Sequence, residues 1–211
     1  EGAAPPVGSS RCQAPDGLEK GGLAAALKAA GLKQGDLVLE TDEMRLGLQG
    51  QVRRVWASRG VKIVQKVQFV FEWAYLLLGV NPLTGEMQWD WVPSMKQADL
   101  LPVLQTWPVA GVIWDRASSH CGKKIAALPI KQVFQPPYSP ELNPAERVFE
   151  ELRRAVEGRI YETLEHKKQA VEVVLYQLAA DPQRVKRLVG WDWLCDAFNS
   201  LPTPQYAPLV H

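Results

Sequence analysis

The chain has 211 residues, of which 46% are hydrophobic and 22% charged, so a domain-sized core can form and gross disorder is excluded. Lys and Arg total 24 against 23 Asp and Glu, and the net charge of +1 excludes a general attraction to polyanions. Three scattered cysteines (Cys12, Cys121 and Cys195) exclude a disulfide framework and a zinc site, and they favour a reducing compartment. Any nucleic-acid surface must therefore be a local patch.

The first 35 residues read as a flexible lead-in followed by a short helix. Gly, Pro, Ala and Ser dominate residues 1–16, and "LEKGGLAAALKAAG" predicts a helix that ends at Gly31. The N-terminus has neither a basic segment nor an apolar one, which is unlike a signal peptide. The longest apolar run, 74–80, is too short to cross a bilayer. We therefore expect a cytoplasmic protein without a membrane partner.

An antiparallel β meander is predicted next. The β-branched and aromatic runs at 36–42, 53–57 and 66–80 read as strands, and the turn signal "NPLTGE" leads to a returning strand at 87–92. The segment "SMKQADLLPVLQTW" fits a helix that Pro102 must bend or divide.

Two more strands joined by a helix follow. The nearly continuous apolar run 109–115 is typical of a strand covered on both faces, and a helix over 120–128 leads to a strand at 130–135. Residues 163–180 and 182–201 each read as one further helix. This order predicts an α/β fold: a mixed sheet with an antiparallel meander plus parallel strands, flanked by helices.

Two acids end predicted strands. Asp115 closes "VIWD", where an acid at the end of a buried strand is expensive to desolvate unless a partner compensates. Asp42 ends the first β run in a similar way, although a solvated strand-end acid also explains it. Ligands in open α/β sheets bind at the carboxyl ends of strands, so both are candidate site residues.

The segment "QPPYSPELNPAERVFEELRR" delivers a third acid. Asn143 is a good N-cap, Pro144 suits the first helical position, and Glu146 falls at the third. The helix presents one apolar stripe, formed by Ala145, Phe149, Leu152 and Val156, with Glu146 on its rim. Glu146 is thus either a site residue or the acidic half of a capping box.

The sequence resembles the catalytic domain of bacterial insertion-sequence transposases of the mariner superfamily. The resemblance rests on "TDEMRLGLQGQVRRVWASRG", "VIWDRASSH" and the proline segment, and it covers most of residues 35–201. It implies a ribonuclease-H-like DDE core over 36–158, with residues 1–35 as a lead-in and 159–211 as a C-terminal helical extension. The family's N-terminal helix-turn-helix region is not evident in the sequence.

The resemblance also implies the catalytic acids and their cofactor. The first Asp is Asp42, the second Asp115 and the final acid Glu146, with 31 positions between the last two (146 − 115), in keeping with the family's spacing. These three residues are expected to hold two Mg²⁺ ions, for which Mn²⁺ can substitute, because carboxylates are suitable hard oxygen ligands. Arg116 departs from the family pattern, since many members carry Asn there.

The implied partners are DNA and a second copy of the chain. Transposon terminal inverted repeats and target DNA are the expected substrates, with a homodimer in the synaptic complex. Candidate DNA contacts are Arg53, Arg54, Arg59, Arg116, His120, Lys123, Lys124, Tyr138 and Arg147. For the cations the alternative is solvated surface charge, for His120 a helix start, and for Tyr138 packing of the proline turn.

Three functions remain open on the sequence alone. The first is a transposase domain that cuts transposon ends and joins them to target DNA. The second is a nuclease or resolvase that cuts without joining. The third is a domesticated DNA-binding module without chemistry. Trp residues are expected in the core rather than in a base-stacking platform, namely Trp73, Trp89, Trp91, Trp114, Trp191 and Trp193.

Overall fold

The computed structural model describes residues 22–50, 56–64, 67–136 and 140–204. The strands are β1 (Val38–Gly47), β2 (Trp73–Val80), β3 (Met87–Val92), β4 (Gly111–Trp114) and β5 (Lys131–Phe134). The helices are α1 (Leu23–Ala29), α2 (Gln97–Thr106), α3 (Lys123–Ala126), α4 (Ala145–Val156), α5 (Leu164–Ala179), α6 (Pro182–Val189) and α7 (Asp192–Asn199). A short 3-10 helix, Pro140–Leu142, precedes α4.

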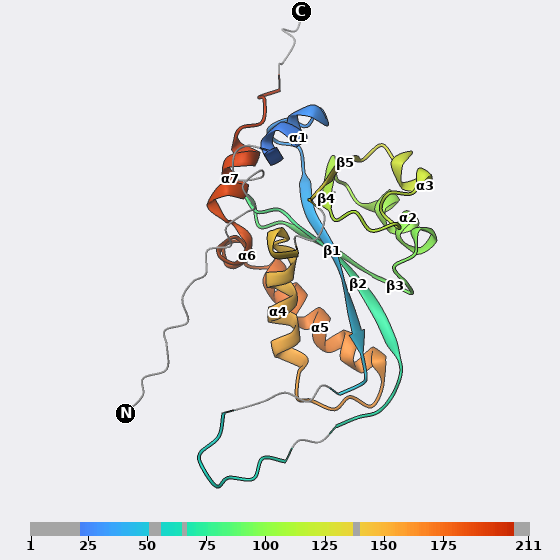
Figure 1. The fold of residues 1–211 in the computed structure, drawn as a ribbon, viewed down its shortest axis with the longest axis vertical. Helices are drawn as coiled ribbons and strands as arrows, with labels where there is room; N and C mark the ends of the chain where they lie inside the picture. The colour runs from blue at the N-terminus through green and yellow to red at the C-terminus, as the bar shows by residue number, and fades with distance from the viewer. Residues whose placement is uncertain (1–21, 51–55, 65–66, 137–139, 205–211) are drawn as a thin grey trace, which may run out of the picture.

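The five strands form one mixed sheet in the order β3-β2-β1-β4-β5 (Figure 1). β1 pairs antiparallel with β2 and parallel with β4, so it stands at the centre of the sheet. β2 and β3 form the predicted hairpin, and β4 and β5 are parallel. The predicted α/β fold, a meander followed by parallel strands, is confirmed.

Helices cover both faces of the sheet. Alternate side chains of a strand point to opposite faces, so Leu76 and Leu78 of β2 pack with α4, α5 and α6, whereas Leu77 packs with α2. The apolar stripe predicted for α4 is buried as expected. A third cluster joins α1 and α7 to Val38 and Ile113 at the opposite end of the sheet from the β1–β2 loop (Figure 1).

The C-terminal helices share the core of the sheet. Val171 and Leu175 of α5 and Val185 of α6 are fully buried in the same cluster as Leu76 and Phe149. The division of the chain at residues 35 and 158 stays a prediction. In the described part of the chain, no helix is long and apolar enough to cross a bilayer.

Some predicted elements differ from the observed ones. β1 runs to Gly47 rather than stopping at Asp42. Of the predicted run 66–80, residue 66 lies outside the described residues, 67–72 are not in a strand, and β2 starts at Trp73. The aromatic side chains before Trp73 lie in solvent, with Phe69 75% and Phe71 68% exposed. The predicted strand 53–57 falls largely outside the described residues, and Trp56 and Ala57 are not in a strand.

The predicted helix 182–201 is two helices. α6 ends at Val189 and α7 starts at Asp192, with Gly190 at the break. α2, by contrast, continues through Pro102 as a single helix. Trp73 is 40% exposed and not a core residue, unlike Trp114, which is 1% exposed.

Candidate active site

Asp42 on β1 and Asp115, immediately after β4, lie level on neighbouring parallel segments. The register pairs Glu40 of β1 with Ile113 of β4, and each acid comes two residues further along its chain. Adjacent strands are about 4.8 Å apart, so the two acids meet at the carboxyl end of the β1–β4 pair. Thr41 strengthens this junction, because its Oγ1 donates a hydrogen bond to the Ile113 carbonyl oxygen at 2.9 Å.

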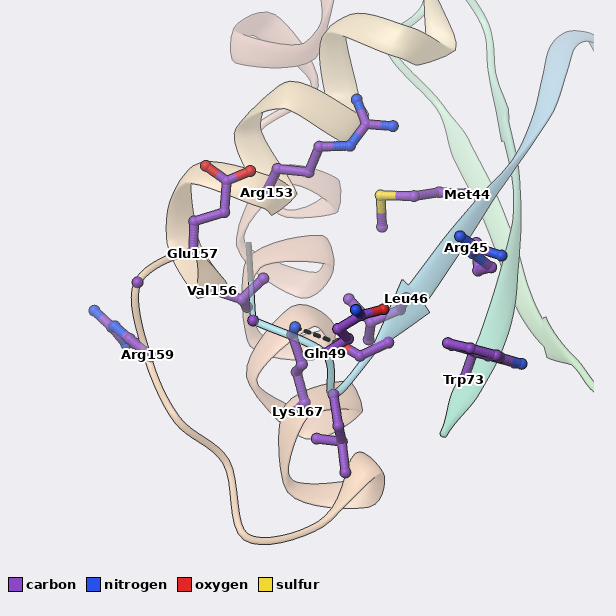
Figure 2. Close-up of a pocket in the computed structure, with 14 residues that line it drawn as sticks. Met44, Arg45, Leu46, Gln49, Trp73, Arg153, Val156, Glu157, Arg159 and Lys167 are labelled. Carbon is purple, nitrogen blue, oxygen red and sulfur yellow. Dashed lines mark hydrogen bonds between the residues drawn. The ribbon is translucent and has the colours of Figure 1, made fainter. Parts of the chain in front are cut away.

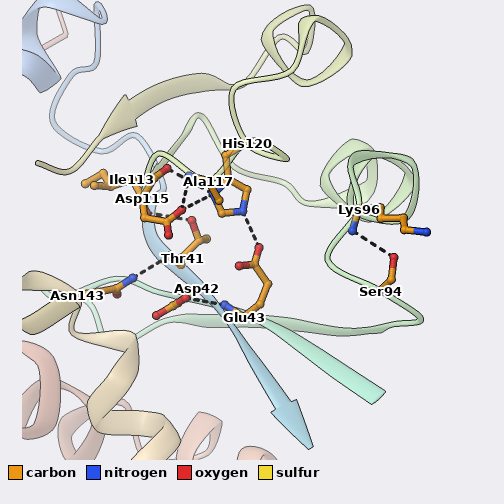
Figure 3. Close-up of polar contacts among 10 residues, drawn as sticks. All are labelled: Thr41, Asp42, Glu43, Ser94, Lys96, Ile113, Asp115, Ala117, His120 and Asn143. Carbon is orange, nitrogen blue, oxygen red and sulfur yellow. Dashed lines mark hydrogen bonds and ion pairs between the residues drawn. The ribbon is translucent and has the colours of Figure 1, made fainter. Parts of the chain in front are cut away.

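Asn143 fixes the position of the helix that carries Glu146. Its side chain is buried, donates from Nδ2 to the Thr41 carbonyl oxygen at 2.9 Å, and accepts at Oδ1 from the Ala145 amide at 3.0 Å (Figure 3). The predicted capping role of Asn143 is therefore confirmed, and Pro144 has helical dihedrals before the first assigned residue of α4. The link to β1 is an additional role, which ties α4 to the strand residue next to Asp42.

The carboxylate of Glu146 contacts Arg153 instead of closing a capping box. Arg153 Nη1 donates to Glu146 Oε2 at 3.2 Å, and both side chains are about two-fifths exposed. Glu146 is nevertheless close enough to Asp42 for its charge to act on that residue's pKa. The three predicted acids are thus neighbours in space.

Burial raises the pKa of Asp42 to about 7. The hydrogen bond from the Glu43 amide, 2.8 Å long, opposes this rise, and the charges of Glu43, Glu146 and Asp115 add to it. Carboxylates placed near a buried acid disfavour its ionised form, which is the electrostatic situation that a bound cation relieves.

His120 is held between two acids behind the site (Figure 3). Its Nδ1 lies 2.7 Å from Asp115 Oδ1, and its Nε2 lies 2.9 Å from Glu43 Oε1. The ring stacks on Trp114 at 4.2 Å with an interplanar angle of 5°. His120 and the Glu43 side chain are only 2% and 3% exposed, whereas the Asp115 side chain is 62% exposed.

The two carboxylates decide the charge of His120. Burial alone lowers the pKa of His120, but the hydrogen bond and charge of Glu43, together with those of Asp115, raise it above its ordinary value. The protonated ring donates from both nitrogens, so it orients Asp115 through one and satisfies buried Glu43 through the other. Because the ring is buried, His120 is not available as the direct DNA contact that the sequence suggested.

A fourth acid lies on the same face of β1 as Asp42. Glu40 is 1% exposed, and its Oε2 accepts a hydrogen bond from Gln135 Nε2 at 2.9 Å. Its other oxygen has no hydrogen-bond partner among the described residues. Burial raises the pKa of Glu40 well above its ordinary value, with the Gln135 hydrogen bond opposing the rise. Glu40 is therefore a buried neighbour of the site whose surroundings favour the protonated carboxyl group.

The three carboxylates are suitable ligands for a hard cation, but in this structure they stand too far apart to enclose one. Carboxylate oxygens are the ligands that Mg²⁺ and Mn²⁺ prefer. Among the described residues, however, no three Asp, Glu, His or Cys side chains converge tightly enough to enclose an ion. Glu146, which Arg153 holds, must turn toward Asp42 and Asp115 for all three acids to share a metal site.

The remaining predicted DNA contacts are dispersed. Arg59, Arg116, Lys123 and Lys124 are exposed, and Arg147 is partly exposed and paired with Glu150 at 3.3 Å. Arg53, Arg54 and Tyr138 lie outside the described residues. Sequence reasoning missed Glu40, Glu43 and Gln135, as well as the roles of His120 and Arg153. The spacing of His120 five residues after Asp115 was the only signal for any of them.

Comparison with known proteins identifies the family and the fold of this chain. A family model described as DDE superfamily endonuclease matches residues 38–166. The Mos1 transposase paired-end complex with left transposon end is similar in structure, with 12% identity and a TM-score of 0.57. The Mos1 Strand Transfer Complex is also similar, with 12% identity and a TM-score of 0.59. Each of these two alignments covers 97% of this chain and 68% of the Mos1 chain.

A third similar structure contains a metal. It is the Mos1 mariner paired end complex with Mn, which has 12% identity and a TM-score of 0.56 over 97% of this chain and 69% of that one. At this identity the likeness concerns the fold, which is ribonuclease-H-like. No curated protein sequence matches this chain significantly.

Proposed function

This chain belongs to the DDE superfamily of endonucleases, and from that membership we propose that it is the catalytic domain of a transposase. In this proposal the domain cuts DNA at transposon ends and joins the freed end to target DNA. The observation that carries the proposal is the level placement of Asp42 on β1 and Asp115 just after β4, with Glu146 within electrostatic reach on α4.

We assign the metal ligands to Asp42, Asp115 and Glu146. Two Mg²⁺ or Mn²⁺ ions would activate the attacking oxygen and stabilise the leaving oxygen of the phosphodiester. The raised pKa of Asp42 supports this assignment, because a cation offsets the repulsion among the three carboxylates. The similar structures whose descriptions name Mn and Mg are consistent with the same chemistry.

The surrounding residues position the three acids. His120, itself held by Glu43, fixes the carboxylate of Asp115, and Asn143 fixes the start of the helix that carries Glu146. Rigid support matters because catalytic groups that are misplaced by about 1 Å lose much of their rate enhancement. We therefore regard His120, Glu43 and Asn143 as positioning residues.

The reaction has two stages. In the first, water attacks a phosphodiester at the transposon end and leaves a free 3′-hydroxyl on one strand. In the second, this hydroxyl attacks a phosphodiester of target DNA, so one P–O bond forms as another breaks and the total number of phosphodiesters is kept. Both stages are in-line displacements at phosphorus, and neither requires a covalent protein intermediate.

Mn²⁺-dependent nicking of supercoiled plasmid tests the catalytic proposal. The wild-type chain should nick the plasmid, and Asp42→Ala should not. Exposed Asp196→Ala serves as the matched control, because it lies on α7 far along the chain from the three acids. Binding of DNA without nicking by the wild-type chain would favour the non-catalytic DNA-binding module.

A strand-transfer assay then separates the two enzymatic functions. A transposase joins a labelled 3′-hydroxyl end to an unlabelled target duplex, whereas a nuclease or resolvase produces only cut ends. Joined product that depends on Glu146 supports the transposase, and cutting without joining supports the nuclease.

A further inference from the structure

A basic cavity lies between the end of β1 and the C-terminal half of α4 (Figure 2). Its volume is about 350 Å³, and four cations line it, namely Arg45, Arg153, Arg159 and Lys167. Among the described residues of the lining, Glu157 is the single acid, so their formal charge is +3 (4 − 1), compared with +1 for the whole chain. The cavity is thus the kind of local positive patch that the overall composition left open.

The cations surround the opening from different elements. Arg45 of β1 lies over the ring of Trp73 at 5.0 Å, on the far side of the β1 ribbon from Arg153 of α4 (Figure 2). Lys167 of α5 donates from Nζ to the Gly47 carbonyl oxygen at 2.6 Å, which holds its ammonium group at the cavity wall. An anion that enters here meets positive charge from β1, from α4 and α5, and from Arg159 in the loop between these two helices.

Arg153 connects this cavity with the catalytic acids. Its guanidinium lines the cavity and also pairs with Glu146 at 3.2 Å, while the Phe149 ring supports it at 5.8 Å. Arg153 has five N–H donors and one carboxylate partner among the described contacts, so it retains donors for an anion. The same side chain therefore touches a proposed metal ligand and a separate cationic cavity.

We propose that this cavity binds a phosphodiester group of a DNA strand, and that its occupation draws Arg153 away from Glu146. The proposal rests on the proposed function, because it assigns a further contact to the same DNA substrate. The released Glu146 can then turn toward Asp42 and Asp115. Strand binding at the cavity and metal binding at the acids should consequently favour each other.

The cavity suits a nucleic-acid strand better than a small apolar ligand. Its cations can contact phosphate oxygens, and Trp73, which is 40% exposed and carries Arg45 over one face of its ring, adds an aromatic side chain to the lining. Guanidinium groups bind phosphate oxygens with two parallel hydrogen bonds, which adds specificity to the charge attraction.

Two matched pairs of variants test strand binding. Arg153→Gln and Lys167→Met change the cavity, whereas Arg154→Gln and Lys168→Met remove the same charge from the neighbouring positions, which pair with Glu151 and Glu165. The measurement is fluorescence anisotropy of a labelled single-stranded oligonucleotide with the whole chain, in EDTA. Thermal unfolding of each variant verifies that it is folded.

We expect each cavity variant to weaken oligonucleotide binding about tenfold at low salt, and to reduce the slope of log affinity against log salt by about 1. Arg153→Lys should recover part of the affinity, because it restores the charge. Equal affinities within both matched pairs would overturn the proposal. A loss of affinity for inorganic phosphate alone, with oligonucleotide binding unchanged, would also overturn it, since the cavity would then hold a free phosphate.

The link to Glu146 has its own readout. Arg153→Gln should bind Mn²⁺ more tightly than the wild type in the absence of DNA, although it binds the oligonucleotide less tightly. The gain is at most about fivefold, because an exposed ion pair contributes little. The oligonucleotide should raise Mn²⁺ affinity in the wild type and in Arg154→Gln, but not in Arg153→Gln.

Opposite changes for two ligands cannot come from a general loss of structure. If Arg153→Gln weakened both ligands, or left the effect of the oligonucleotide on Mn²⁺ intact, Arg153 would not couple the two sites. Failure of plasmid nicking would leave these binding results in force, so the cavity and the catalytic proposal can fail separately.

Discussion

Asn143 donates a hydrogen bond to the backbone of Thr41 and thereby fastens the start of α4 to the strand that carries Asp42. The same side chain accepts from the Ala145 amide, so one buried amide group both caps the helix and places it. This relationship gives the segment around "NPAE" a role in placing α4. The prolines limit the path of the chain, and Asn143 sets its end point against the sheet.

Loss of Asn143 should destabilise the fold. Asn143→Ala leaves the Thr41 carbonyl and the Ala145 amide without their partner, which should lower the free energy of unfolding by roughly 2–3 kcal/mol. Urea unfolding measures this change. Asn199→Ala, at the exposed end of α7, is the control and should cost less than about 0.5 kcal/mol. Equal costs for the two variants would contradict the role given to Asn143.

Asp42 should make the metal-free protein less stable as the pH rises. Its pKa is about 7 in the folded chain and about 4 in an unfolded one. The folded state thus keeps a proton that the unfolded state releases, and stability falls between about pH 4 and pH 7. In EDTA at pH 8, Asp42→Asn should therefore be more stable than the wild type by roughly 2–4 kcal/mol.

Urea unfolding at pH 5 and pH 8 measures this difference. Asp196→Asn, an exposed acid on α7, should keep the pH profile of the wild type. An Asp42→Asn variant with an unchanged profile would show that Asp42 does not carry the raised pKa.

Divalent metal should offset the loss of stability that ionised Asp42 causes in the metal-free protein. Mn²⁺ at about 100 times its dissociation constant stabilises a folded protein by about 2.7 kcal/mol, which for a chain of this length is a rise of roughly 5–11 °C in melting temperature. We expect this shift in the wild type and its loss in Asp115→Asn. Differential scanning fluorimetry with added Mn²⁺ and then with EDTA measures both. A full shift in Asp115→Asn would exclude Asp115 as a ligand.

The positions of these acids were predictable to different degrees. Asp42 and Asp115 follow from strand patterns, because parallel strands bring their carboxyl ends to one edge. Glu146 follows from the helix-start pattern, but its contact with Arg153 does not. That contact spans two helical turns of exposed side chains, and propensity and periodicity do not determine which rotamers exposed side chains adopt. Likewise, the alternation that buries Glu43 against His120 depends on the packing of β1 beside Trp114.

The predicted ends of helices and strands were wrong where tertiary contacts determine them. The apolar run before Trp73 has strand composition, yet without covering layers its aromatic side chains remain exposed. Gly190 interrupts the last helical pattern because the chain turns there toward α1, with which α7 packs. These outcomes depend on neighbours that are distant in the sequence.

Removal of His120 should leave a buried charge without its partner. His120→Ala separates Glu43 from its hydrogen bond at a site that is almost fully enclosed, which should cost about 3 kcal/mol or more. The double variant Glu43→Gln with His120→Ala should recover at least about 1 kcal/mol of that loss. Additive costs in urea unfolding would show that the two residues do not interact.

The contribution of His120 to stability changes over a different pH range from that of Asp42. Because its pKa is raised by folding, its contribution is complete below the unfolded value of about 6.5 and is lost as the pH rises through the folded value. The stability difference between the wild type and His120→Ala should therefore shrink at alkaline pH. A difference that grows with pH would contradict this assignment.

Two turn glycines should differ sharply in their tolerance of a methyl group. Gly85, in the β2–β3 turn, has φ +77, and an added Cβ would lie 2.2 Å from the Pro182 carbonyl oxygen. Gly158 has φ +71 but open space around it. Gly85→Ala should cost well over 2 kcal/mol, whereas Gly158→Ala should cost about 1 kcal/mol from backbone strain alone. Similar costs would mean that the hairpin moves freely away from α6.

Neighbouring acids on β1 have opposite surroundings, since Asp42 faces α4 and Glu43 faces His120 (Figure 3). The alternation of a strand has a period of two, so inserting or deleting one residue between Val38 and Asp42 would exchange the two positions. The altered chain would have almost the same composition, but its two acids would face the wrong sides of the sheet. For anyone who grafts this strand onto another scaffold, residue count is thus a stricter requirement than residue type.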